Sequence, residues 1–176
     1  MIRALAPVLL ALAVLAPEAF AACTDTAAPA VQWRRCLLDG VDLSSENVSG
    51  GDLRDASFKR ADLTGAKLAN IQGRRAKFVS ASMGGADLSG ADLVQADLTN
   101  ADLSGANLKG ANLRGARLFQ ANMRNVDLTD AVLTGADLLH VDFSGARWTD
   151  GRTVCADGSS GSCRPTGSAA GNKVEG

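Results

Sequence analysis

Residues that commonly carry enzyme chemistry are scarce in this chain of 176 residues, which has a single His and no Tyr. The lone His140 has Asp137 and Asp142 nearby in the sequence, and we interpret it as a solvated surface residue. The sequence contains no glycine-rich nucleotide loop, no cluster of metal ligands and no grouped nucleophile and base. We therefore predict that the protein is not an enzyme and uses no cofactor.

A strong excess of either charge is also lacking, because 18 Lys and Arg stand against 19 Asp and Glu for a formal net charge of −1. A nucleic-acid-binding protein usually has a clear basic excess. The basic residues here are interleaved with Asp, so we expect no nucleic-acid partner.

Long apolar runs are absent except near the N-terminus, where residues 4–16 are almost entirely apolar. Arg3 precedes this run, and Ala19, Phe20 and Ala21 follow it as a small-residue cleavage site. This order is typical of a secretory signal peptide, and the run is too short to cross a membrane as a stable helix. We predict a signal peptide over residues 1–21 and a periplasmic or secreted bacterial protein.

The residues around Cys23 allow a second interpretation. The segment from Phe20 to Cys23 resembles a bacterial lipoprotein processing site, although Phe stands where Leu is usual. In this alternative Cys23 carries a lipid, and the protein is an outer-membrane lipoprotein that serves as an envelope spacer. Membrane contact is expected only in that case.

A large apolar residue recurs every fifth position over residues 31–150, as in "GADLSGADLVQADLTNADLSGANLKGANLRGA". On an α-helix a step of five rotates the residue by roughly 140°, and on a strand an odd step alternates faces. Neither element could bury this pattern on one side. A chain that turns a corner after every five residues could, so the period predicts a solenoid.

The 120 residues contain 24 pentapeptides without an insertion. Ala usually stands two positions before the large residue, Asp or Asn stands directly before it, and two small polar or charged residues follow. This A(D/N)LXX pattern resembles the pentapeptide-repeat family. The resemblance implies an all-β solenoid, a right-handed quadrilateral β-helix with 20 residues per coil, and hence about six coils in a rod roughly 29 Å long.

The resemblance divides the chain into segments. We expect an N-terminal cap and first repeat over residues 22–35, the β-helix over 36–150, a disulfide-closed C-terminal cap over 151–163, and a disordered tail over 164–176. The cap segment "DGRTVCADGSSGSC" resembles the caps of exported bacterial members of the family.

A coil of 20 residues also predicts which side chains stack inside. Phe58 and Phe78 would share one interior column, and Met83 and Met123 another. Gly73 leaves a gap at an interior position, which Ile71 would fill because interiors tolerate neither voids nor overpacking. The predicted core also includes Trp33 and Trp148 as bulky lids at the two ends of the tube.

Export gives the four Cys residues a structural role, because disulfides form in oxidising compartments. Four Cys allow 3 connectivities. The two ends of the implied rod are too far apart for a bridge, which needs Cα atoms within about 7 Å. We therefore predict the pairs Cys23–Cys36 and Cys155–Cys163, and we disfavour metal binding because no His lies near either pair.

The remaining function class is binding, through one face of the rod. Phe119 and Leu139 would stack in one outer column, flanked by Arg117 and His140, and exposed apolar spots often mark interfaces. A second candidate is the basic outer column of Arg54, Arg74 and Arg114. We predict an exported scaffold that binds an unknown protein or envelope component, with self-association as a further possibility.

Some members of the family imitate DNA and protect topoisomerases. Those proteins are cytoplasmic and strongly acidic. The signal peptide and the near-neutral charge of this chain disfavour that function.

Overall fold

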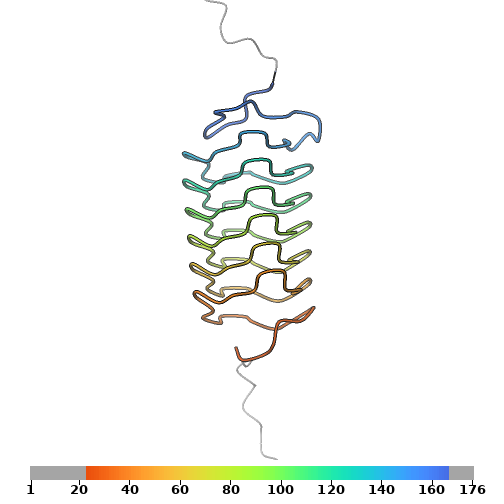
Figure 1. Ribbon diagram of the computed structural model, residues 1–176, viewed down its shortest axis with the longest axis vertical. Helices are drawn as coiled ribbons and strands as arrows, with labels where there is room; N and C mark the ends of the chain where they lie inside the picture. Colours follow the sequence, from red (N-terminus) through yellow and green to blue (C-terminus); the bar gives the residue numbers. More distant parts are fainter. Residues whose placement is uncertain (1–22, 167–176) are drawn as a thin grey trace, which may run out of the picture.

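The computed structural model describes residues 23–166, which form a four-sided rod of stacked coils with a smaller cap at its C-terminal end (Figure 1). The predicted signal peptide, residues 1–21, lies outside the described residues. The described part contains no helix, and therefore none with the length and hydropathy that a bilayer demands. Its β-structure consists of isolated bridges rather than longer strands, so sides of the coil serve as elements here.

Six coils of 20 residues begin at Val31, Gly51, Ile71, Ala91, Ala111 and Ala131. We name the four sides of each coil A, B, C and D, which in the first coil are residues 31–35, 36–40, 41–45 and 46–50. Within each side, the second residue is the bridge position, the third the centre, the fourth the outer position and the fifth the corner. Every bridge position from Gln32 to Asp127 pairs in parallel with the residue 20 positions later, which confirms the predicted coil length.

Main-chain hydrogen bonds explain why five residues make one side. At one typical corner, the amide of Ala66 donates to the carbonyl of Leu63. The amide of Leu63 donates to the carbonyl of Ser82 in the next coil, and the amide of Asp62 to the carbonyl of Val41 in the preceding coil. The corner residue Gly65 has φ of 64°, and the same positive φ recurs at every fifth residue from Ala30 to Gly145. A turn with positive φ at its third residue is a type II turn, which prefers Gly or Asn there.

The interior is filled by the side chains of the centre residues and of the Ala residues that usually stand first on each side. Phe58 and Phe78 are 1% and 0% exposed, and their rings stack with centroids 5.3 Å apart. Met83 and Met123 are fully buried, as predicted. Trp33 is also buried at the N-terminal end, where its ring lies 6.3 Å from that of Phe58.

The gap at Gly73 is filled as the sequence predicts. A Cβ atom on Gly73 would lie 2.9 Å from a methyl carbon of Leu93 and 3.5 Å from the Cδ1 atom of Ile71. Ile71 itself is 1% exposed. The two neighbours therefore occupy the volume that a large centre residue takes elsewhere.

Both predicted disulfides are present. Cys23 is joined to Cys36 beneath the first coil, with Cα atoms 5.5 Å apart, and Cys155 to Cys163 in the cap, with Cα atoms 5.0 Å apart. Because the Cys23 sulfur forms this disulfide, it cannot also carry a lipid through a thioether bond.

The C-terminal cap is larger than predicted. Arg164 and Thr166 are paired with Ala156 and Val154 through main-chain hydrogen bonds, because the chain folds back after Cys163. The predicted boundary of the tail at residue 164 is therefore wrong, and the ordered cap extends to Thr166. Residues 167–176 lie outside the described part of the chain.

Trp148 is half-buried under this cap, where its ring makes an edge contact with Phe143 at 5.1 Å between centroids. The cap pairs with sides C and D of the sixth coil by antiparallel bridges, Asp142 to Ser160 and Arg147 to Val154.

Candidate interaction face

Side B departs furthest from the Asp/Asn rule at the bridge position. Its six bridge residues are Leu37, Ser57, Lys77, Asp97, Arg117 and Asp137. Elsewhere the Asp or Asn side chain accepts a hydrogen bond from the amide two residues later, as Asp62 does from Thr64 at 2.9 Å. This bond holds the corner in place, in the manner of an Asx turn.

The sides differ in how many of their bridge residues accept this hydrogen bond from the outer residue. On side C the amides of five outer residues donate to it, from Ser44, Thr64, Ser104, Arg124 and Ser144. On side B only Thr99 and Leu139 do so, to Asp97 and Asp137. Four of the six bridge residues of side B therefore hold no corner in this way. Ser57 is buried and donates to Asp39, which leaves Leu37, Lys77 and Arg117 exposed on this side.

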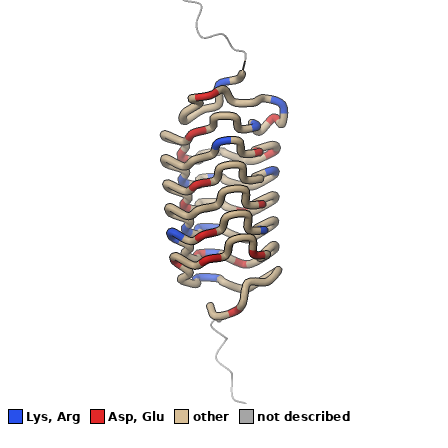
Figure 2. The backbone as a smooth tube through the Cα atoms, in the orientation of Figure 1, with Lys and Arg blue, Asp and Glu red and all other residues tan. Residues whose placement is uncertain are grey.

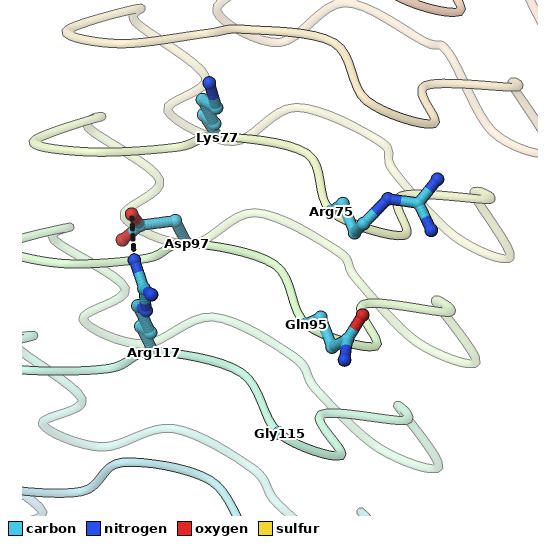
Figure 3. Close-up of a pocket in the computed structure, with 6 residues that line it drawn as sticks. All are labelled: Arg75, Lys77, Gln95, Asp97, Gly115 and Arg117. Atoms are coloured by element: carbon cyan, nitrogen blue, oxygen red, sulfur yellow. Dashed lines mark ion pairs between the residues drawn. The ribbon is translucent and has the colours of Figure 1, made fainter.

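A groove of about 330 Å³ lies along the edge between sides A and B, lined by Arg75, Lys77, Gln95, Asp97, Gly115 and Arg117. Figure 3 shows its two columns, with Asp97 between Lys77 and Arg117 in one, and Arg75, Gln95 and Gly115 following the corner in the other. Gly115 has no side chain, which leaves that end of the groove open. The columns come from three successive coils.

The groove is basic on balance. Arg117 lies 3.8 Å from a carboxylate oxygen of Asp97, and Arg75 binds Asp55 one coil below through two hydrogen bonds of 2.7 and 3.0 Å. The hydrogen bond from Arg75 lowers the pKa of Asp55 below its usual value. Lys77 forms no ion pair within residues 23–166. One uncompensated cation therefore faces the groove, with two more that are only partly neutralised.

Apolar side chains continue side B toward the C-terminal end. Leu139 is 56% exposed, and Phe119, one coil below, is half-buried with its ring edge-on to His140 at 5.8 Å between centroids. Arg117 lies on the same side two residues before Phe119. The structure thus brings together the predicted Phe119, Leu139 and Arg117.

The other predicted basic residues, Arg54, Arg74 and Arg114, lie on side A and do not join this cluster. Arg54 binds Asp52 through two nitrogens, and Arg74 Nε donates to Asp92 at 2.6 Å. Arg54 lowers the pKa of Asp52 through this hydrogen bond. Figure 2 shows the resulting mixture of basic and acidic residues along the coils. Arg54 and Arg74 are therefore neutralised by carboxylates of their own side, whereas Arg114 forms no ion pair within residues 23–166.

Side C has the acidic bridge residues Asp42, Asp62, Asp102 and Asp142. Asp42 and Asp62 are directly paired in the ladder, yet the amide of Ser44 lowers the pKa of Asp42 through a hydrogen bond. Within residues 23–166 no group of three or more His, Cys, Asp or Glu is arranged to hold a metal ion. The carboxylates serve the corners.

The protein-family model described as pentapeptide repeats matches the chain in 8 copies, over residues 36–72, 56–93, 81–120 and 111–147. The chain belongs to the pentapeptide repeat family. The right-handed quadrilateral β-helix predicted from the sequence is the fold of this family, and the family is in general a non-catalytic scaffold for interactions.

Solved pentapeptide repeat proteins resemble the chain as well. One is Rfr23 from the cyanobacterium Cyanothece 51142, with 27% identity, 66% of this chain and 90% of that chain covered, and a TM-score of 0.43. Another comes from the thylakoid lumen of Arabidopsis thaliana, with 25% identity, coverage of 74% and 86%, and a TM-score of 0.38.

QnrB1, described as a plasmid-mediated fluoroquinolone resistance protein, is 21% identical over 66% of this chain and 67% of that chain, with a TM-score of 0.39. No match was found among the curated proteins.

Sequence reasoning did not identify the groove or its lining residues Gln95 and Gly115. The sequence did contain a signal. The bridge residues fall into four columns, one for each side of the coil, and only the side B column lacks Asp or Asn in four of its six coils. Sorting the repeats by side would have found it.

Proposed function

We propose that the protein is an exported, non-enzymatic interaction module that binds a protein or envelope component through side B. The observation that carries this proposal is the combination on one side of basic bridge residues, Lys77 and Arg117, with apolar outer residues, Phe119 and Leu139. Arg and aromatic residues are enriched at interface hot spots.

The chemistry of side B indicates what kind of partner would fit. The groove favours a carboxylate or another anionic group, which could reach Lys77 and Arg117. The Phe119 and Leu139 column favours an apolar side chain next to that group. A partner surface with an acidic residue beside an apolar one matches both.

Export is supported by the two disulfides, since such bonds persist in oxidising compartments. The signal peptide pattern of residues 1–21 agrees with this compartment. The lipid-anchored alternative needs the sulfur of Cys23, which the disulfide to Cys36 already uses. We therefore propose a periplasmic or secreted protein without a membrane anchor.

The test replaces Phe119 and Leu139 by Ser, with Lys109→Ser and Thr129→Ser as the control pair at outer positions on side D. Crosslinking in intact host cells and sedimentation of the purified protein report partner capture and self-association. We expect the side B pair to lose most of the crosslinked product while the control pair keeps it. Unchanged crosslinking and sedimentation in both would overturn the proposal.

A further inference from the structure

The cap covers only half of the last coil. Its residues pair with sides C and D of the sixth coil, where Phe143 donates to Ser159 and Trp148 to Thr153. Within residues 23–166, no strand lies above sides A and B of that coil, residues 131–140. This end of the ladder is open, as an edge strand is.

Several main-chain groups on this open half have no partner in the described part of the chain. In the coils below, each centre and each corner amide donates to the next coil, as Leu113 does to Val132 and Gly115 to Thr134. The amides of Leu133, Gly135, Leu138 and His140 make no such bond to any described residue. The carbonyls of Ala131 and Ala136, which would accept from the next coil, are likewise free there. These four amides and two carbonyls are the groups that pair with the next coil elsewhere in the rod.

The side chains of the open half are apolar and accessible. Leu133 and Leu138 are centres, yet they are half-buried, whereas the centres of the middle coils are 0–1% exposed. Val132 and Leu139 are 37% and 56% exposed. Together they form an apolar surface at the mouth of the tube, of the kind that marks a binding site.

The cap also decides what can bind there. It occupies the layer above sides C and D, so a second copy of the rod cannot place a complete four-sided coil on this end. A single extended segment over sides A and B meets no such obstacle.

Charge selects among such segments. Charged residues stacked in neighbouring coils are mostly of opposite sign, as in Lys67 with Asp87 and Arg117 with Asp137. Asp137 has no ion-pair partner within residues 23–166, and the strand that would lie above it is missing. A Lys or Arg opposite Asp137 would complete the column, and an apolar residue would suit Val132.

We propose that residues 131–140 are a docking edge for an extended segment of a partner protein, which adds one strand and places a basic residue opposite Asp137 and an apolar residue opposite Val132. Main-chain pairing of this kind supplies affinity, and the alternate side chains supply specificity. The main-chain edge is separate from the groove of side B, although Leu139 belongs both to this edge and to the side B surface. Its test follows the amides of Leu133 and Leu138, so it can succeed or fail independently of the side B test.

The test uses the full mature chain and a capped peptide, "AVLSGAKLSG", whose Val and Lys are placed over Val132 and Asp137 in parallel register. The control peptide has the same sequence with N-methyl groups on its Val and Lys, which removes the two donors to Ala131 and Ala136. Amide hydrogen exchange is followed by NMR. We expect the first peptide to slow exchange of the Leu133 and Leu138 amides about tenfold near saturation.

Charge reversal provides the second arm. In the Asp137→Lys variant, the peptide with Lys should no longer protect the Leu133 and Leu138 amides. A peptide with Asp in place of that Lys should protect them again. Asp102→Lys, at a bridge position with coils on both sides, should leave peptide binding unchanged.

Three results would overturn the proposal. One is an absence of protection by the first peptide, and another is equal protection by the N-methylated peptide, which would exclude strand pairing. The third is that Leu133 and Leu138 are already protected in the free chain. In that case, exposure after deletion of residues 167–176 would identify the chain's own end as the occupant, and exposure on dilution would identify a second copy.

Discussion

At the scale of single residues, each position in the pentapeptide answers to a different constraint. The centre must fill a narrow tube, the corner must adopt positive φ, and the bridge residue must accept a hydrogen bond or face a partner. Phe78 and Ser80 lie two residues apart on side B and answer to the first and the second constraint. Their substitutions should therefore differ in sign.

Replacing Phe78 by Ala should lower the free energy of unfolding by about 3–5 kcal/mol, because it removes a fully buried ring that stacks on Phe58. Phe119→Ala should cost much less, since that ring is only half-buried at an outer position. Chemical denaturation of both variants measures the difference. Equal shifts of the midpoint would show that the assignment of inside and outside is wrong.

Replacing Ser80 by Gly should stabilise the protein by roughly 0.5–1 kcal/mol. Ser80 has φ of 56°, which is costly for a residue with a Cβ atom, and the gain exceeds the added freedom of the unfolded chain. Gly105→Ala is the matched reverse change, because φ there is 67° and the space around it is open. Thermal unfolding should move the two midpoints in opposite directions, and a shift of the same sign in both would contradict the turn geometry.

At the scale of elements, the two ends of the rod are closed in different ways. The N-terminal segment is held by Cys23–Cys36, and the C-terminal cap by Cys155–Cys163 together with a compact set of hydrogen bonds around Asp150. Neither closure is part of the repeat. Both ends should therefore respond to reduction, and the C-terminal end to acid, before the middle coils do.

Replacing both Cys155 and Cys163 by Ser should destabilise the cap, since closing a short loop is worth about 2–3 kcal/mol in the chain-entropy model. Hydrogen exchange should rise at Phe143 and Trp148, whose amides are bonded to the cap, and stay low at Leu103 in the fourth coil. Non-reducing peptide mapping of the wild-type chain should find only the two local pairs. A crosslink between the ends of the rod would contradict the fold.

Acid should loosen the cap through Asp150. The side-chain hydrogen bond from Thr153, with amide bonds from Thr153 and Arg152, lowers the pKa of Asp150 from 3.8 to about 2. A carboxyl with a depressed pKa stabilises the folded state above the unfolded value, and that stabilisation disappears as the pH falls through the folded value. Stability should therefore decline between about pH 4 and pH 2.

Thr153→Val removes the strongest of these hydrogen bonds and should raise the pKa of Asp150 toward 3.8 in an NMR titration. The thermal midpoint of this variant should fall less steeply between pH 4 and pH 2 than that of the wild type. The reverse order would show that Asp150 is not the group responsible.

At the scale of the whole molecule, three sides of the rod differ in chemistry. Side C has acidic bridge residues, side A carries arginines of which three are paired with carboxylates, and side B combines a basic groove with apolar residues. The open half of the last coil adds a second surface at one end.

Processing of the chain is a further whole-molecule prediction. Cleavage after Ala21 should give a mature protein that begins at Ala22, because Ala19, Phe20 and Ala21 form the cleavage motif. Intact mass spectrometry of the exported protein measures this directly. A mass that includes residues 1–21 would refute cleavage, and an added diacylglyceryl group on Cys23 would favour the lipoprotein alternative.

The sequence by itself determined that the chain turns a corner every five residues, because neither a helix nor a strand can bury that period on one face, and its resemblance to the pentapeptide-repeat family implied the coil of 20 residues. It therefore predicted the stacking of Phe58 on Phe78, the filling of the gap at Gly73 and the pairing of the cysteines. Only the tertiary structure decided how far the cap extends and that it covers two sides of four. The repeat sets local spacing, whereas the path of the chain after Asp150 depends on contacts that no period encodes.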